Sequence, residues 1–108
     1  MPSSKRLKQV IVMRKALGMS PGKMIAQAGH AVSESPNPGE RIKRIALWAD
    51  DASSLHALMA KCVEKGLPYS PVIDSGKTEV EPGSFTCMAI GPAQECDIDE
   101  VTGRLDLI

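Results

Sequence analysis

The chain has 108 residues, 43% of them hydrophobic, and equal numbers of acidic and basic side chains. This length supports one domain built around one core. Trp48, Tyr69 and Phe85 are the only aromatic residues. The core must therefore be aliphatic and rich in methionine, and the stacking of exposed bases on aromatic side chains has almost no residues to draw on.

The cysteines, Cys62, Cys87 and Cys96, are odd in number and widely spaced. We therefore expect no disulfide framework, no zinc pattern and a reducing compartment. The N-terminal segment has no long apolar run, which indicates neither a signal peptide nor a membrane span. These features predict a cytoplasmic protein that makes no membrane contact.

Charge is distributed unevenly along the chain. Residues 1–49 carry nine Lys or Arg and two Glu, whereas residues 50–108 carry four Lys or Arg and eleven Asp or Glu. A basic face can bind phosphates even when the net charge is zero. Folding can also interleave the two halves and cancel the field, and the sequence leaves both interpretations open.

The first elements follow from short local patterns. Residues 1–7 are polar and basic, and we expect them to be frayed. The β-branched run at 8–14 predicts a buried strand, and 15–19 predicts a loop. Ser20 as N-cap and Pro21 at the first helical position predict a helix of about three turns.

The remaining elements alternate in type. After an exposed turn at 33–40 we expect a strand at 41–49 and then a helix. Asp50 or Asp51 caps this helix, which ends near Lys65, before Gly66. We then expect a strand at 70–73, a loop at 75–84, a strand at 85–90 that stops at Gly91-Pro92, and a short helix at 97–102. The order βαβαββα predicts an α/β domain with a parallel core, to which the last connection adds a strand in the other direction.

The helix after Ser20 has two distinct faces. Residues spaced i, i+4 and i+7 share a face, which here holds Lys23, Gln27 and His30. We expect the apolar residues to lie mostly on the opposite side and to pack on the sheet: Met24, Ile25, Ala28 and Val32. The polar face is either a solvated edge or part of a site, and the second interpretation requires a second group of polar residues.

Asp74 supplies a candidate for that second group because it directly follows the predicted strand at 70–73. Ligands of open α/β sheets bind beyond the carboxyl ends of strands, so parallel strands would bring Asp74 and the Lys23 face to one edge. Alternatively, Asp74 bonds its own backbone as a turn residue. A phosphate loop is excluded because Met24 follows Lys23, and no metal site is expected around His30 or His56.

Several separated motifs together resemble one known family. They are Gly22-Lys23-x-x-Ala26-Gln27-x-x-His30-Ala31, Asp74-x-Gly76-x-Thr78-x-x-x-Pro82-Gly83-Ser84-x-Thr86, Gly66-Leu67-Pro68, Gly91-Pro92 and Ile98-Asp99-x-Val101-Thr102-Gly103-x-Leu105. From about residue 8 to 107 the chain resembles the archaeal and eukaryotic type (type 2) of peptidyl-tRNA hydrolase. The resemblance implies a mixed four-stranded sheet flanked by helices in a single domain over residues 1–108.

The resemblance also implies an activity and a site. The activity is cofactor-free hydrolysis of the ester that joins a peptide to the 3′-terminal ribose of tRNA. The catalytic residues that it implies are Lys23, Asp74, Thr78 and Thr86. As a hypothesis, Asp74 orients a water molecule or holds Lys23, while Lys23 or the hydroxyls of Thr78, Ser84 and Thr86 stabilise the oxyanion.

Contacts to the tRNA follow from the same hypothesis. Gln27 and His30 are candidates for binding the ribose or the terminal nucleotide, although His30 reads equally well as a structural residue. The candidates for binding tRNA phosphates are Arg14, Lys15, Arg41, Lys43 and Arg44.

Two features depart from the family pattern. The region between His30 and the second strand is short, so a helical segment looks missing, and Ser75 stands where alanine is common. The alternatives are a non-catalytic module that binds tRNA or a protein, and a small regulator that binds a phosphorylated metabolite. Whether the chain acts alone or as a homodimer is left open.

Overall fold

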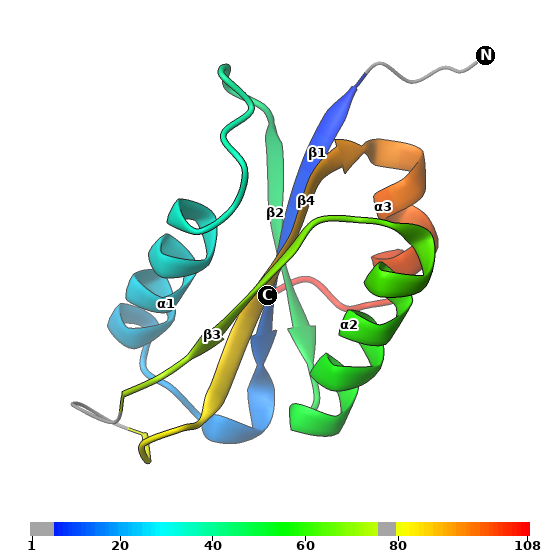
Figure 1. Cartoon of the computed structure of the whole chain (residues 1–108). Coiled ribbons are helices and arrows are strands. Elements are labelled where there is room, and N and C mark those ends of the chain that lie inside the picture. The colour runs from blue at the N-terminus through cyan, green and yellow to red at the C-terminus, as the bar shows by residue number, and fades with distance from the viewer. Residues whose placement is uncertain (1–5, 76–79) are drawn as a thin grey trace.

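The structure is a computed structural model that describes residues 6–75 and 80–108 (Figure 1). Its elements in chain order are β1 (Leu7–Arg14), a single 3₁₀ turn η1 (Lys15–Leu17), α1 (Pro21–Ser33), β2 (Lys43–Ala49), α2 (Ala52–Lys65), β3 (Tyr69–Ile73), β4 (Phe85–Gln94) and α3 (Glu95–Thr102). The predicted order βαβαββα is confirmed. Thr78, one of the expected catalytic residues, lies outside the described residues.

The strands form one mixed sheet in the order β2-β1-β4-β3. β1 and β2 are parallel, and β4 is antiparallel to both of its neighbours, β1 and β3. As a result, β1, β2 and β3 run in the same direction and their carboxyl ends lie at the same edge of the sheet. This edge also receives the amino end of β4.

Helices cover both faces of the sheet, with α1 on one face and α2 and α3 on the other (Figure 1). The larger core lies between the sheet and the α2–α3 layer, and its members include Val10, Val12, Leu55, Met88 and Ile98. The smaller core lies under α1, and its members include Ile11, Met13, Ala31, Val72 and Cys87. These side chains are aliphatic or contain sulfur, as the composition predicts.

The predicted caps set the positions of α1 and α2. The Ser20 hydroxyl accepts a hydrogen bond of 3.2 Å from the backbone N–H of Lys23, and Pro21 is the first residue of α1. Asp51, not Asp50, caps α2 by accepting from the N–H of Ser54 at 2.9 Å. Each cap satisfies a donor that would otherwise lack a helical partner.

β4 does not stop at Gly91-Pro92, and that prediction was wrong. The strand continues to Gln94 through a cis peptide bond between these residues. The register with β1 shifts there, between Lys8 and Val10, and such an irregularity accommodates a proline that cannot donate to the ladder. Gly91 has φ of 102°, and a Cβ atom there would lie 2.6 Å from the carbonyl oxygen of Lys8, so only glycine fits.

Two connections differ from ordinary loops. Residues 34–42, all of them described, link α1 to β2 without a helix, in agreement with the short segment expected there. The residues after α3 pair with the outer edge of β2, where Trp48 N donates to Asp106 O at 2.9 Å and Ile108 N donates to Ala46 O at 3.1 Å.

Among residues 6–75 and 80–108, no helix combines the length and apolar character needed to cross a bilayer.

Candidate active site

Lys23 and Asp74 form an ion pair at the edge where β1 and β3 end. Lys23 comes from the first turn of α1, Asp74 directly follows β3, and Lys23 Nζ lies 2.7 Å from Asp74 Oδ1. The two side chains are 10% and 8% exposed, respectively. The meeting of these residues, which the sequence predicted for parallel strands, is confirmed, and it places a cation and a carboxylate together in a largely desolvated position.

Gln27 connects this pair to the interior of the sheet. Its Nε2 donates to Thr86 Oγ1 at 2.7 Å and lies 3.4 Å from Asp74 Oδ1. The Thr86 hydroxyl donates in turn to the carbonyl oxygen of Val72 at 3.3 Å. Thr86 is fully buried and its hydroxyl is engaged on both sides, so that among the described residues Gln27 links Thr86 to Asp74.

The division of α1 into a polar and an apolar face differs from the prediction. Ile25 was expected to pack on the sheet, but it is 73% exposed, whereas Gln27 is buried. Met24, Ala28 and Val32 do pack against the core under α1. The helix is rotated so that the Gln27 amide faces β4, where Thr86 and Asp74 satisfy it and make its burial favourable.

The backbone around Asp74 closes the end of the β3–β4 pair. Asp74 N donates to Ser84 O at 2.9 Å, and Gly83 N donates to Asp74 O at 2.8 Å. Ser84, predicted as a substrate contact, is therefore bonded directly to Asp74 through the backbone. Ser84 is also partly exposed. Thr78 belongs to residues 76–79, of which nothing is described.

A cavity of about 240 Å³ opens beside the ion pair, between α1 and β3. It is lined by Gln27, His30, Glu34, Val72, Ile73, Asp74 and Ser75. His30, predicted as a substrate contact or a structural residue, lines this cavity and is exposed. Glu34 was not predicted; its position four residues after His30, on the same side of the helix, was the available signal.

Arg14 and Lys15 lie near the edge that carries the ion pair, but both make contacts of their own. Arg14 Nη1 donates to Phe85 O at 3.4 Å, and Arg14 Nε is buried without a partner among the described residues. Lys15 Nζ lies 5.9 Å from the centroid of the Trp48 ring, a cation–π arrangement.

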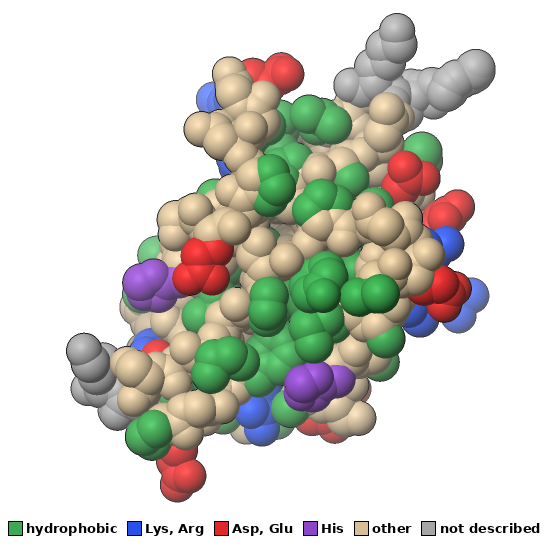
Figure 2. All heavy atoms as spheres, in the orientation of Figure 1, with side chains coloured by type: hydrophobic (Ala, Val, Ile, Leu, Met, Phe, Trp, Pro, Cys, Tyr) green, Lys and Arg blue, Asp and Glu red, His purple; other side chains and the backbone are tan. Residues whose placement is uncertain are grey.

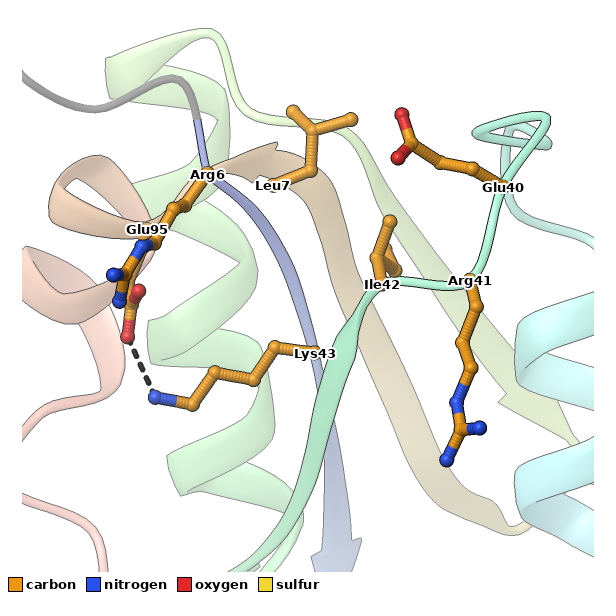
Figure 3. A pocket seen from close by; sticks show the side chains of 7 residues that line it. All are labelled: Arg6, Leu7, Glu40, Arg41, Ile42, Lys43 and Glu95. Carbon is orange, nitrogen blue, oxygen red and sulfur yellow. Dashed lines mark hydrogen bonds and ion pairs between the residues drawn. The ribbon is translucent and has the colours of Figure 1, made fainter.

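Arg41, Lys43 and Arg44 lie at the opposite edge of the sheet, where β2 begins. Figure 3 shows Lys43 directed toward Glu95 at the start of α3, with a distance of 2.7 Å between Nζ and Oε2. Lys8 pairs with Asp99 of the same helix. Folding therefore does interleave parts of the basic and acidic halves, although Arg41 and Arg44 form no ion pair among the described residues.

Surface charge is otherwise mixed. Figure 2 shows acidic and basic side chains side by side around the molecule, with hydrophobic side chains gathered in its centre. The ionic contacts of α3 dominate this pattern, because Glu95, Asp99 and Glu100 each hold a lysine.

The geometry defines a small α/β protein with a buried lysine–carboxylate site at the carboxyl ends of its strands. Residues 7–108 match the family described as peptidyl-tRNA hydrolase PTH2. The chain belongs to this family. The family membership inferred from the separated motifs is thereby confirmed.

Relatives from several archaea carry the name peptidyl-tRNA hydrolase. The protein from Methanocaldococcus jannaschii is 37% identical, with 94% of this chain and 100% of the relative covered. The protein from Methanopyrus kandleri is 42% identical, with 94% and 97% covered. A solved structure of a protein of unknown function from Agrobacterium tumefaciens has a TM-score of 0.68 at 12% identity, covering 94% of this chain and 97% of that one, a likeness of fold alone.

The alignment with one relative contains positions that this chain does not fill. The match to the Methanocaldococcus jannaschii protein extends over 115 aligned positions, to which this chain contributes 94% of its 108 residues. The relative therefore has about a dozen residues that this chain lacks. Lys23, Gln27, Asp74 and Thr86 are all present and in contact in the shorter chain.

Proposed function

We propose that the chain hydrolyses the ester between a peptide and the 3′-terminal ribose of tRNA and so recycles tRNA, with Lys23 and Asp74 as its catalytic pair. Family membership supports the reaction. The observation that carries the assignment of residues is the 2.7 Å contact between Lys23 Nζ and Asp74 Oδ1 beside an open cavity.

The chemistry requires only water and these side chains. An ester is already activated for attack, so no covalent enzyme intermediate is needed. Asp74 directs the attacking water at the carbonyl carbon and accepts its proton, and when the ester bond to the ribose breaks, the departing ribose oxygen takes up that proton and leaves as a hydroxyl. The Lys23 ammonium stabilises the negative charge that develops on the carbonyl oxygen, an interaction that is stronger in a partly buried position than in water.

The neighbouring residues have supporting roles in this proposal. Gln27 and Thr86 hold the Asp74 carboxylate in one orientation, so Thr86 is assigned as a positioning residue. Hydroxyls of Ser84 and Thr78 add hydrogen bonds to the oxyanion. The cavity beside the pair takes the 3′-terminal nucleotide, with His30 at its rim.

The basic residues predicted from the sequence supply sites for tRNA phosphates. Arg14 and Lys15 lie at the edge that carries the catalytic pair, whereas Arg41, Lys43 and Arg44 lie at the far edge. A substrate formed during translation places the enzyme in the cytoplasm. Binding that depends on phosphate contacts weakens as salt concentration rises.

The test is release of free peptide from an N-acetyl-aminoacyl-tRNA. Lys23→Met and Asp74→Asn preserve side-chain size while removing charge, and each should lower kcat by about 100-fold or more. Lys61→Gln, which removes an exposed charge on α2, is the matched control and should behave like the unmodified chain. Undiminished turnover in Lys23→Met or Asp74→Asn would refute the assignment, and tRNA binding without any turnover would indicate a binding module.

A further inference from the structure

Arg41 and Arg44 lie far from the catalytic pair. Asp74 follows Ile73, and the strand registers place Ile73 level with the carboxyl ends of β1 and β2. Arg44 lies near the opposite end of β2, where that strand begins. With about 3.3 Å per residue and about 4.8 Å between strands, Arg44 is roughly 20 Å from Asp74 along the strands and about 14 Å across them. No mononucleotide reaches both positions at once.

Arg44 is held in place by a buried side chain. Its Nε donates to Gln9 Oε1 at 2.7 Å, and Gln9 is fully buried and donates through Nε2 to Gly91 O at 3.4 Å. Gln9 and Arg44 are direct partners in the β1–β2 register. One nitrogen of the guanidinium is therefore fixed by the protein while the residue as a whole stays exposed, and a guanidinium held in this way can donate its terminal N–H groups to a phosphate.

Arg41 lies next to this position and on the same side of the sheet. Figure 3 shows its side chain running alongside β2, drawn between β2 and α1, and pointing away from Glu40 and from the group formed by Arg6, Lys43 and Glu95. Arg41 and Arg44 line one shallow surface hollow together with Ile42 and Lys43. Of the basic residues in this hollow, Lys43 is engaged by Glu95, so Arg41 and Arg44 carry the charge available to a ligand.

The helix on the side of the sheet that carries both pairs has no carboxylate, and Glu34 and Glu40 follow it in the connection to β2. Gln9 belongs to the face of β1 that packs under α1 with Ile11 and Met13, so Arg44 is on the α1 face of the sheet. α1 itself, Pro21–Ser33, contains no Asp or Glu. The acidic helix α3 covers the other face, which directs a polyanion to the α1 side.

We propose that Arg41 and Arg44 bind phosphates of the duplex part of the tRNA while the 3′ end occupies the catalytic cavity. This inference rests on the proposed function and extends it, because the affinity for the substrate then depends on a part of the tRNA outside its 3′ end. The arginine pair contributes to tRNA affinity and takes no part in cleavage of the ester.

The experiment compares two substrates: an N-acetyl-aminoacyl-tRNA and the same N-acetyl-aminoacyl group esterified to the trinucleotide CCA. The double variant Arg41→Gln/Arg44→Gln should raise KM for the tRNA on the order of tenfold without changing kcat. The slope of log KM for the tRNA against log salt concentration should fall by the amount expected for the loss of about two phosphate contacts. The kcat/KM for the trinucleotide should stay within about twofold of the unmodified chain.

Two further variants make the result decisive. Arg104→Gln removes an arginine charge after α3 and should change neither substrate. Arg41→Gln leaves the bond between Arg44 and Gln9 in place, so its effect on tRNA KM is free of any loss of stability at Gln9. Equal losses on both substrates, or an unchanged KM for tRNA, would overturn the inference alone, whereas no hydrolysis of either substrate by the unmodified chain would overturn the proposed function and the inference with it.

Discussion

Gln27 and Thr86, separated by 59 residues in the sequence, share a hydrogen bond of 2.7 Å in the interior of the protein. Both side chains are buried, at 2% and 0% exposure. The second hydrogen of the Gln27 amide is directed at Asp74, 3.4 Å away. The orientation of the Asp74 carboxylate therefore depends on a hydroxyl that is sealed from solvent.

The substitution Thr86→Val should test this dependence. It removes the acceptor of Gln27 without changing side-chain shape greatly, which should cost about 1–2 kcal/mol of stability. Loss of carboxylate orientation should lower kcat by about 10-fold to 100-fold with little change in KM. Thr86→Ser, which keeps the hydroxyl, should recover most of kcat, and a Thr86→Val enzyme with normal kcat would show that the hydroxyl serves stability alone.

The Lys23–Asp74 pair should show strong energetic coupling. Removing either charge leaves the other largely desolvated without its partner, which should cost about 3–5 kcal/mol of stability. In the double variant Lys23→Met/Asp74→Asn neither charge remains, so the loss should be smaller than the sum of the single losses. Urea denaturation of the four proteins measures the coupling, and additive losses would mean that solvent already screens the pair.

Asp51 should make the stability of the protein depend on acidic pH. The hydrogen bond from the backbone N–H of Ser54, followed by that from the Ser54 hydroxyl, holds the pKa of Asp51 below its ordinary value of 3.8. A lowered pKa means that this stabilisation is present above pH 3.8 and is lost as pH falls through the lower folded value.

The variant Asp51→Asn keeps an N-cap side chain but cannot titrate. Thermal unfolding from about pH 6 to about pH 2 should therefore show the Tm of the unmodified chain converging on that of the variant as acid is added. A constant difference between the two proteins over this range would show that Asp51 does not titrate differently in the folded state.

Thiol reactivity should distinguish the three cysteines. Burial raises the pKa of the thiols of Cys62 and Cys87 to about 11. Cys87 Sγ also lies 3.5 Å from the carbonyl oxygen of Gln27, under α1. A maleimide at neutral pH should therefore modify the exposed Cys96 first, with the other two reacting only on unfolding, as mass spectrometry of timed samples would reveal. Early labelling of Cys87 would mean that α1 opens readily.

The sequence predicted the parts of the fold that depend on local chemistry. Ser20 and Gly66 mark helix ends because their capping roles are decided within a few residues. The predicted end of β4 was wrong because the sheet accommodates Pro92 through a register irregularity with β1, which no local pattern encodes. The exposure of Ile25 and the burial of Gln27 were missed for the same reason, since the rotation of α1 is set by Thr86, far along the chain.

For the site, the meeting of Lys23 and Asp74 followed from strand direction, and Thr86 followed from the family motif. The positioning role that we propose for Thr86 required the packing, because only packing shows that its hydroxyl is sealed from solvent. The separation of Arg41, Lys43 and Arg44 from Arg14 and Lys15 required the β1–β2 register, which places the first three at the far edge.

The central position of β4 also determines when the site can exist. β3 touches the rest of the sheet only through β4, its one neighbour, so the segment that carries Asp74 is not anchored until residues 85–94 have been inserted between β1 and β3. Residues 1–74 are synthesised before the strand that pairs with β3, so at those chain lengths Asp74 lacks the contacts that Ser84 and, through Gln27, Thr86 give it in the complete fold. The geometry of the Lys23–Asp74 site is therefore complete only after almost all of the sequence has been made.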